Sequence, residues 1–119
     1  MDIRQDRKAL IESAEKYLEA GRKGNIDLMK EVFHIDATIF GYFEGKFLGG
    51  PIQLLYDWMK SFGAAPNIDG QVVSADLEGT IGNVKVQAKD WCGYNFTDYL
   101  NFFKIDGKWV IINKMFFHN

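Results

Sequence analysis

The side chains best suited to chemistry in this chain of 119 residues are a few polar ones set among apolar residues that alternate as in β-strands. Successive side chains of a strand point to opposite faces of its sheet. After residue 82, Val84, Val86 and Ala88 share a face with Asp90. This apolar face is expected to look toward the core. We therefore predict Asp90 at the edge of a cavity, where a carboxylate can act as a general base.

The next two predicted strands carry further polar groups at the same spacing. Tyr99 and Asn101 share a face of the first, and Asn113 and Met115 share a face of the second. If these faces also point inward, the polar groups meet in a mostly aromatic cavity, which is typical of a small-molecule site. The predicted ligand-binding residues are Tyr17, Tyr56, Trp58, Met59, Asp90, Tyr99, Asn101, Asn113 and Met115.

The polar residues among these also have a structural interpretation. Tyr17 can be a core tyrosine whose hydroxyl is bonded to a neighbour. Asp90 can stand in water at a strand end, beside Lys89. Asn101 and Asn113 can be buried amides that bridge neighbouring strands. The residues alone leave both interpretations open.

The other reactive residues do not form a site. His34 and Asp36 lie two positions apart, but two ligands do not make a metal site, and His118 lies at the far end of the sequence. Cys92 is the only cysteine, so no disulfide forms within the chain, and no base stands near it in sequence to activate its thiol. We predict neither a metal nor a cofactor.

Charge and composition limit the expected partners. The 14 basic and 16 acidic residues are interleaved and give a formal net charge of −2, so neither nucleic acid nor an anionic membrane is expected as a partner. The first residues are polar and no apolar run approaches transmembrane length, so we expect a cytoplasmic protein. Aromatic residues make up 15% of the chain. So much bulky surface must find a core, a pocket wall or a partner subunit.

These residues must be positioned by helices that are followed by strands. Helical periodicity predicts helices over 3–20 and 25–33, and Gly50-Pro51 predicts the start of a third helix. A short hairpin is expected between the second and third helices. A chain of 119 residues is expected to form one domain, 1–119. We predict an α+β fold in which a cone-shaped, curved antiparallel sheet, made of the hairpin and four long strands, packs on three helices. The long strands are predicted over 71–79, 83–92, 95–106 and 108–117.

Four stretches carry a resemblance to a known superfamily. They are residues 17–19, 24–26, 33–38 and 96–114. Together with the order of elements, they resemble the nuclear transport factor 2-like superfamily, which includes SnoaL-like proteins, and within it the branch named for lumazine binding. The resemblance covers nearly the whole chain. It implies the fold, with a pocket between helices and sheet, but no single activity, because isomerases, dehydratases, cyclases, hydrolases and pure binders share this fold.

Resemblance to the ketosteroid isomerases of this superfamily implies roles for particular positions. Those enzymes use a carboxylate base and two hydrogen-bond donors at the substrate oxygen. By this resemblance Tyr17 and Asn101 take the places of the donors. The isomerases have their base directly after a segment that matches 37–40, where this chain has Gly41. Glycine cannot accept a proton, so that mechanism is not expected, and Asp90 is left as the candidate base beside Tyr17 and Asn101.

The opposite faces of the last two strands are expected to point outward. A homodimer through the sheet, as relatives commonly form, would cover the apolar residues there. These residues are Leu100, Phe102, Val110, Ile112 and Phe116.

Three functions stay open. The first is binding of a small hydrophobic or heterocyclic ligand without catalysis. The second is a cofactor-independent lyase, isomerase or hydrolase acting on a hydrophobic carbonyl or cyclic substrate. The third is a protein–protein adaptor that uses the outer face of the sheet.

Overall fold

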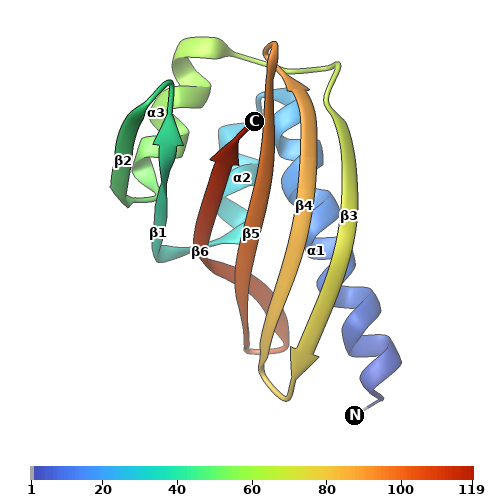
Figure 1. Ribbon diagram of the computed structural model, residues 1–119. Coiled ribbons are helices and arrows are strands. Elements are labelled where there is room, and N and C mark those ends of the chain that lie inside the picture. Colours follow the sequence, from blue (N-terminus) through green and yellow to red (C-terminus); the bar gives the residue numbers. More distant parts are fainter. Residues whose placement is uncertain (1) are drawn as a thin grey trace.

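The computed structural model describes residues 2–119, which form three helices and six strands (Figure 1). The predicted α+β fold is confirmed, and the four long strands begin and end within two residues of their predicted bounds. The elements in chain order are α1 (Ile3–Lys23), α2 (Ile26–Val32), β1 (Phe33–Phe43), β2 (Lys46–Pro51), α3 (Gln53–Phe62), β3 (Asp69–Glu78), β4 (Ile81–Trp91), β5 (Tyr94–Ile105) and β6 (Lys108–His118).

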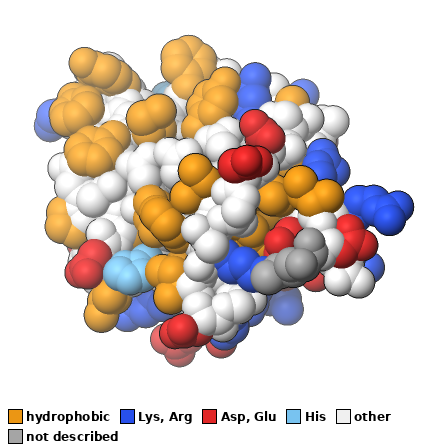
Figure 2. Space-filling view, turned by 90° about the horizontal axis from the view of Figure 1, so that it is seen from below, with side chains coloured by type: hydrophobic (Ala, Val, Ile, Leu, Met, Phe, Trp, Pro, Cys, Tyr) orange, Lys and Arg blue, Asp and Glu red, His pale blue; other side chains and the backbone are white. Residues whose placement is uncertain are grey.

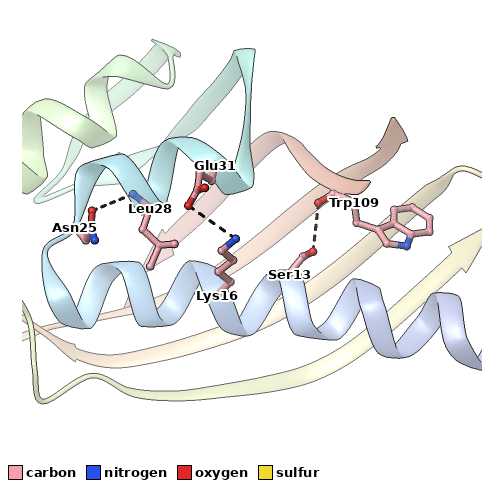
Figure 3. Close-up of polar contacts among 6 residues, drawn as sticks. All are labelled: Ser13, Lys16, Asn25, Leu28, Glu31 and Trp109. Carbon is pink, nitrogen blue, oxygen red and sulfur yellow. Dashed lines mark hydrogen bonds and ion pairs between the residues drawn. The ribbon is translucent and has the colours of Figure 1, made fainter. Parts of the chain in front are cut away.

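The ends of the first two helices have local causes. The Asp2 carboxylate caps α1 by accepting a hydrogen bond from the Arg4 N–H at 2.9 Å. That helix ends at Gly24, whose φ of 63° lies in the left-handed region that favours glycine. Asn25 then caps α2, because its side-chain oxygen accepts from the Leu28 N–H at 3.0 Å (Figure 3). The sequence therefore turns sharply between two helices that must pack on each other.

The start of α3 differs from the prediction. The helix begins at Gln53, and Pro51 is the last residue of β2 instead of the first residue of the helix. The cause is the hairpin, in which Pro51 still stands opposite Thr38 of β1. Tertiary pairing thus overrides the preference of proline for a first helical turn.

The six strands form one sheet in the order β2-β1-β6-β5-β4-β3. Strands β1 and β6 run parallel to each other, whereas every other neighbouring pair is antiparallel. The predicted all-antiparallel sheet is therefore wrong at this one pairing. It arises because the N-terminal hairpin joins the edge of the last strand, which brings Phe40 beside Met115 although they are far apart in sequence.

The helices cover one face of the sheet, and the core lies between them (Figure 1). Polar contacts fasten α1 to its neighbours, as Figure 3 shows. The Ser13 hydroxyl donates to the Trp109 carbonyl of β6 at 3.3 Å, and Lys16 pairs with Glu31 of α2 at 4.0 Å. The core side of α1 carries the buried residues Leu10, Ala14, Tyr17 and Leu18. Among residues 2–119, no helix is both apolar and long enough to cross a bilayer.

The inward faces of β5 and β6 differ from those predicted. In β5 the buried row is Phe96, Asp98, Leu100 and Phe102, and the predicted row with Tyr99 and Asn101 faces outward. In β6 the prediction holds for Trp109 and Ile111, and then fails. Asn101 and Phe102 stand opposite Asn113 and Ile111, so Ile112 is an extra residue, a β-bulge. Beyond it Lys114 and Phe116 turn inward, and Met115 and Phe117 turn outward.

A second bulge ends β4. Val84, Val86 and Ala88 are fully buried as predicted. The register then shifts between Ala88 and Trp91, so that Trp91 takes the next inward position. Asp90, in the bulge, has a φ of 60° and is exposed.

The outer face of the sheet carries large exposed hydrophobic side chains. Hydrophobic side chains gather along the upper margin of Figure 2. We call outer patch the six exposed side chains that stand opposite or beside one another on β1, β2, β5 and β6, namely Phe40, Tyr42, Phe47, Tyr99, Met115 and Phe117. Phe103 and Ile105 are also exposed but lie further along β5. The patch differs from the expected set, of which Leu100 and Phe102 are buried and Val110, Ile112 and Phe116 are half-buried.

Candidate functional site

A pocket of about 70 Å³ opens between α3 and the inner face of the sheet. Its mouth is formed by Leu48 of β2 and Leu54 of α3, which are both partly exposed. Its deep end is formed by Trp91 and Lys114, which are both buried. The remaining lining residues are Ile39, Phe43, Leu55, Trp58, Phe96 and Phe116. The wall is therefore apolar and largely aromatic, with one charged side chain at its inner end.

Lys114 is that charged side chain, and its surroundings are rings. Its exposed fraction is 6%. The Nζ atom lies 5.0 Å from the centre of the Tyr17 ring, 5.2 Å from that of Trp91 and 5.9 Å from that of Phe116. Aromatic faces attract a cation, but they cannot accept the three N–H bonds of an ammonium group as water does. Burial therefore lowers the pKa of Lys114, and the nearby Asp98 carboxylate offsets part of that effect.

Tyr17 and Asp98 form a buried pair beneath the amine. The Tyr17 hydroxyl donates to Oδ2 of Asp98 at 2.7 Å, and neither side chain is exposed to solvent. Burial raises the pKa of Asp98, while the charge of Lys114 and the bond from Tyr17 act in the opposite direction. The pKa of Tyr17 is raised well above its usual value, first by burial and then by Asp98. Tyr17 is thus a neutral donor at physiological pH.

Two fully buried polar atoms in this region lack hydrogen-bond partners among residues 2–119, namely Oδ1 of Asp98 and Nε1 of Trp91. The Lys114 amine, which lies against the Trp91 ring, also makes no hydrogen bond to a described residue. A buried polar group without a partner costs on the order of 1–3 kcal/mol. Trp91 and Lys114 both line the pocket, and the Tyr17 ring touches both of them, with its centre 5.6 Å from that of Trp91. The Lys114 amine can therefore offer N–H donors to a polar group at the deep end of the pocket.

The structure separates the predicted site residues. Of the nine predicted ligand-binding residues, Trp58 lines the pocket, and Tyr17 lies just beneath it against Lys114. Tyr56 and Met59 are buried in the core without lining the pocket. Tyr99 and Met115 belong to the outer patch, which is the opposite side of the sheet. The prediction that these residues converge on one cavity is wrong.

Asp90 does not reach the pocket. Its carboxylate faces a tight turn, where Oδ1 accepts the Gly93 N–H at 3.1 Å, and its own N–H donates to Asn95 at 2.9 Å. The bulge that carries it removes it from the row of Val84, Val86 and Ala88. As a candidate base, Asp90 is therefore misplaced for anything bound in this pocket.

Asn101 and Asn113 bridge strands on the outer face. Asn83 donates to Asn101 at 2.9 Å, Asn101 donates to Asn113 at 3.1 Å, and Asn113 donates to the Thr38 hydroxyl at 3.0 Å. The chain of bonds crosses four strands, from β4 to β1. The geometry thus supports the interpretation of Asn101 and Asn113 as amides that bridge neighbouring strands. The side chain beside the Tyr17 hydroxyl is Asp98, and not Asn101 as the resemblance implied.

Gly41 is required by packing. It faces inward on β1 opposite Phe116, and a Cβ atom there would lie 2.5 Å from the Phe116 carbonyl oxygen and 2.7 Å from its ring. The place where the ketosteroid isomerases hold their base is thus filled by an aromatic side chain. Phe116 also lines the pocket, so the absence of a side chain at Gly41 leaves room for the Phe116 ring in the pocket wall.

The remaining reactive residues have local roles. Nδ1 of His34 accepts the Asp36 N–H at 3.0 Å, which is a turn interaction. In the part of the chain that the structure describes, no group of three or more metal-ligating side chains comes together. The Cys92 thiol lies 3.9 Å from the carbonyls of Phe62 and Ala64, and burial followed by the charge of Asp90 raises its pKa. A thiol of raised pKa is a poor nucleophile at neutral pH.

Comparison with known proteins identifies the class. Residues 5–117 match the family described as "Putative lumazine-binding", and the chain belongs to this family, a branch of the nuclear transport factor 2-like superfamily. Two solved structures of nuclear transport factor 2-like proteins of unknown function share its fold. One, from Shewanella baltica, is 31% identical with a TM-score of 0.93, and the match covers 100% of this chain and 98% of that one. The other, from Methylobacillus flagellatus, is 38% identical with a TM-score of 0.91 and covers 97% and 93%.

One relative carries the name of an activity. The protein "Aldolase FrzH" from Cladobotryum sp is 36% identical over 109 residues, which are 91% of this chain and 87% of that protein.

Proposed function

We propose that this protein binds a small, mostly apolar aldehyde or ketone in its aromatic pocket and promotes aldol-type carbon–carbon bond chemistry on it. The observation that carries the proposal is the buried amine of Lys114, which has no hydrogen-bond acceptor among the described residues at the deep end of an otherwise apolar pocket. Among the functions that the sequence left open, this is the lyase acting on a hydrophobic carbonyl compound.

The chemistry of an aldol reaction explains why such a pocket suits it. A proton leaves the carbon beside a carbonyl group, and the negative charge that develops on the carbonyl oxygen must be stabilised. The Lys114 amine is a donor at the deep end. Apolar walls exclude water, which strengthens such interactions. The similarity to a relative named as an aldolase supports the same reaction class.

Proton exchange at a simple ketone tests the proposal without knowledge of the substrate. Cyclohexanone in D₂O is followed by NMR, because loss of an α-proton is common to every aldol mechanism. We expect the protein to accelerate exchange. Leu54→Trp, which narrows the mouth, should slow exchange, whereas Ile35→Trp, at a side chain 89% exposed outside the pocket, should not. Binding of cyclohexanone without any acceleration would leave a non-catalytic binding protein, and the proposal would be wrong.

We also propose that the outer patch forms a homodimer interface. Six large hydrophobic side chains on adjacent strands are exposed there, and a contiguous apolar area of this kind marks an interaction surface. A second copy related by a two-fold axis would cover patch with patch. Sedimentation at micromolar concentration should show a dimer, and Phe117→Glu should give a monomer while Ile35→Glu does not. A monomeric wild type would instead favour an unlike partner and the adaptor interpretation.

A further inference from the structure

We propose that Lys114 is a covalent catalytic residue, whose amine condenses with the substrate carbonyl to form an imine. This inference rests on the proposed function, because it names the bond by which the pocket would activate a carbonyl compound. It concerns the atom that reacts, whereas aldol chemistry by itself can also proceed through hydrogen bonds to the carbonyl oxygen.

The position of the amine is the first argument. Nζ of Lys114 lies among the rings of Tyr17, Trp91 and Phe116 at 5.0 to 5.9 Å from their centres, and the side chain lines the pocket. No hydrogen bond or ion pair within 4.0 Å to another described residue holds it. A lysine that only stabilised the fold would be expected to use its three N–H groups on carbonyls or carboxylates. This amine is left available to whatever enters.

The charge state is the second argument. A protonated amine has no lone pair to attack carbon, so a nucleophilic lysine must be neutral in an appreciable fraction of molecules. Burial among rings lowers the pKa of Lys114. The one acidic group facing it is Asp98 on β5, whose Oδ2 is already bonded to Tyr17 of α1, and the residues that α3 and β4 bring to the pocket are uncharged. The surroundings therefore raise the fraction of neutral amine above that of an exposed lysine.

The reaction balances without an oxidant or reductant. The nitrogen lone pair forms a bond to the carbonyl carbon, and the resulting carbinolamine loses the oxygen as water, so that ketone and amine give imine and water. A proton from solvent converts the imine to an iminium ion, which is an electron sink. The α-proton then passes to the water molecule released in the condensation, and the C–H electron pair forms the double bond of a neutral enamine. Asp98 is a positioning residue for these reaction steps. Its Oδ1 has no hydrogen-bond partner, and its Oδ2 is bonded to Tyr17, so its charge is held at a fixed place near the amine.

The pocket also indicates the substrate class. Apart from Lys114, every lining residue is apolar or aromatic. A carboxylate or phosphate beside the carbonyl would be buried without a second cation, which is costly. The expected substrates are therefore neutral aldehydes and ketones with apolar substituents, and cyclohexanone should react better than pyruvate.

Reductive trapping tests the covalent step. The folded protein is incubated with cyclohexanone and sodium cyanoborohydride near pH 7, and the site of cyclohexyl addition is found by peptide mass spectrometry. We expect Lys114 to be labelled more strongly than any other lysine, because burial lowers its pKa and its amine lines the pocket that binds the ketone. Lys30 is a matched control, because its Nζ lies 5.5 Å from the centre of the Tyr56 ring but its side chain is exposed.

Two variants separate this inference from the proposed function. Lys114→Met should abolish trapping at this site and reduce cyclohexanone proton exchange to the background, and Lys30→Met should change neither. Exchange that persists in Lys114→Met, with no adduct in the wild type, would overturn the imine and leave the aldol function in place. Trapping at Lys114 without accelerated exchange would keep the imine and overturn the aldol function. Preferential labelling by pyruvate would overturn the substrate class.

Discussion

Removing the hydroxyl of Tyr17 is the sharpest test of how the site is held. Tyr17→Phe deletes one oxygen from a fully buried side chain and leaves its ring contacts with Phe33 and Trp91 in place. Asp98 then loses the bond to Oδ2, and Oδ1 is already without a partner. A hydrogen bond to a charged group contributes about 1.5–3 kcal/mol, and one between neutral groups about 1 kcal/mol. At pH 7 we expect the free energy of unfolding to fall by about 2 kcal/mol.

The effect should depend on pH in a definite direction. The folded-state pKa of Asp98 is raised above its unfolded value of 3.8. Between those two values the native state binds the proton more tightly than the unfolded state, so stability falls as pH rises. Tyr17 holds that pKa down, so its removal raises the pKa of Asp98 further and deepens the loss at neutral pH. Below pH 3.8 Asp98 is neutral in both states, and the difference between variant and wild type should shrink to about 1 kcal/mol.

Urea denaturation of both proteins across this pH range measures the difference directly. Contributions from Lys114 are common to both proteins and largely cancel. Tyr99→Phe serves as the control, because it removes the same atom from a side chain 41% exposed on the outer face. A loss under about 0.5 kcal/mol at pH 7, or one that grows toward acid pH, would show that Asp98 does not rely on Tyr17 as argued.

Three further substitutions test the packing and polar contacts around the site. Gly21→Ala should cost about 1–3 kcal/mol in thermal unfolding, because its Cβ would lie 2.7 Å from the Trp91 ring; a gain, as helix propensity alone favours, would contradict the packing. Asn101→Leu should cost about 1–2 kcal/mol in urea, since it leaves the amides on either side without their bonds; a neutral result would mean that water replaces them. Lys104→Met should cost about 1–3 kcal/mol at neutral pH, because it leaves the Asp6 carboxylate, 2.7 Å from Nζ and little exposed, without that cation; no change in the urea midpoint would contradict this.

The sequence predicted the elements well because their signals are local. Apolar spacing, helix caps and glycine-containing turns depend on a few neighbouring residues, and the bounds of the long strands followed from them. Pro51 was misjudged because a long-range pairing decided its place. The parallel pairing of β1 with β6 has no local signal at all, since it depends on which edge of the sheet the hairpin joins.

The inward face of β5 was misjudged because both of its faces are rich in apolar residues. Asp98 is the one acidic residue in the row with Phe96, Leu100 and Phe102, and that exception was the available signal for the site. The resemblance directed attention to Asn101 instead. Burial of the whole row shows that a single acid inside an apolar row is better evidence of a constrained carboxylate than an amide on the neighbouring row.

Two β-bulges, at Ile112 and after Ala88, interrupt the alternation of inward and outward side chains and also bring the candidate site together. If Ile112 took part in regular alternation instead of forming a bulge, Lys114 would lie on the outer face and Asn113 inside. Without the bulge after Ala88, Asp90 would point inward in place of Trp91. Each bulge exchanges one side chain for its neighbour, and the result is an amine against an indole at the deep end of the pocket. Bulges occur often beside active sites because they re-aim a side chain without changing the fold. Neither Ile112 nor Asp90 is a glycine or proline, so no residue type at these positions indicates a bulge.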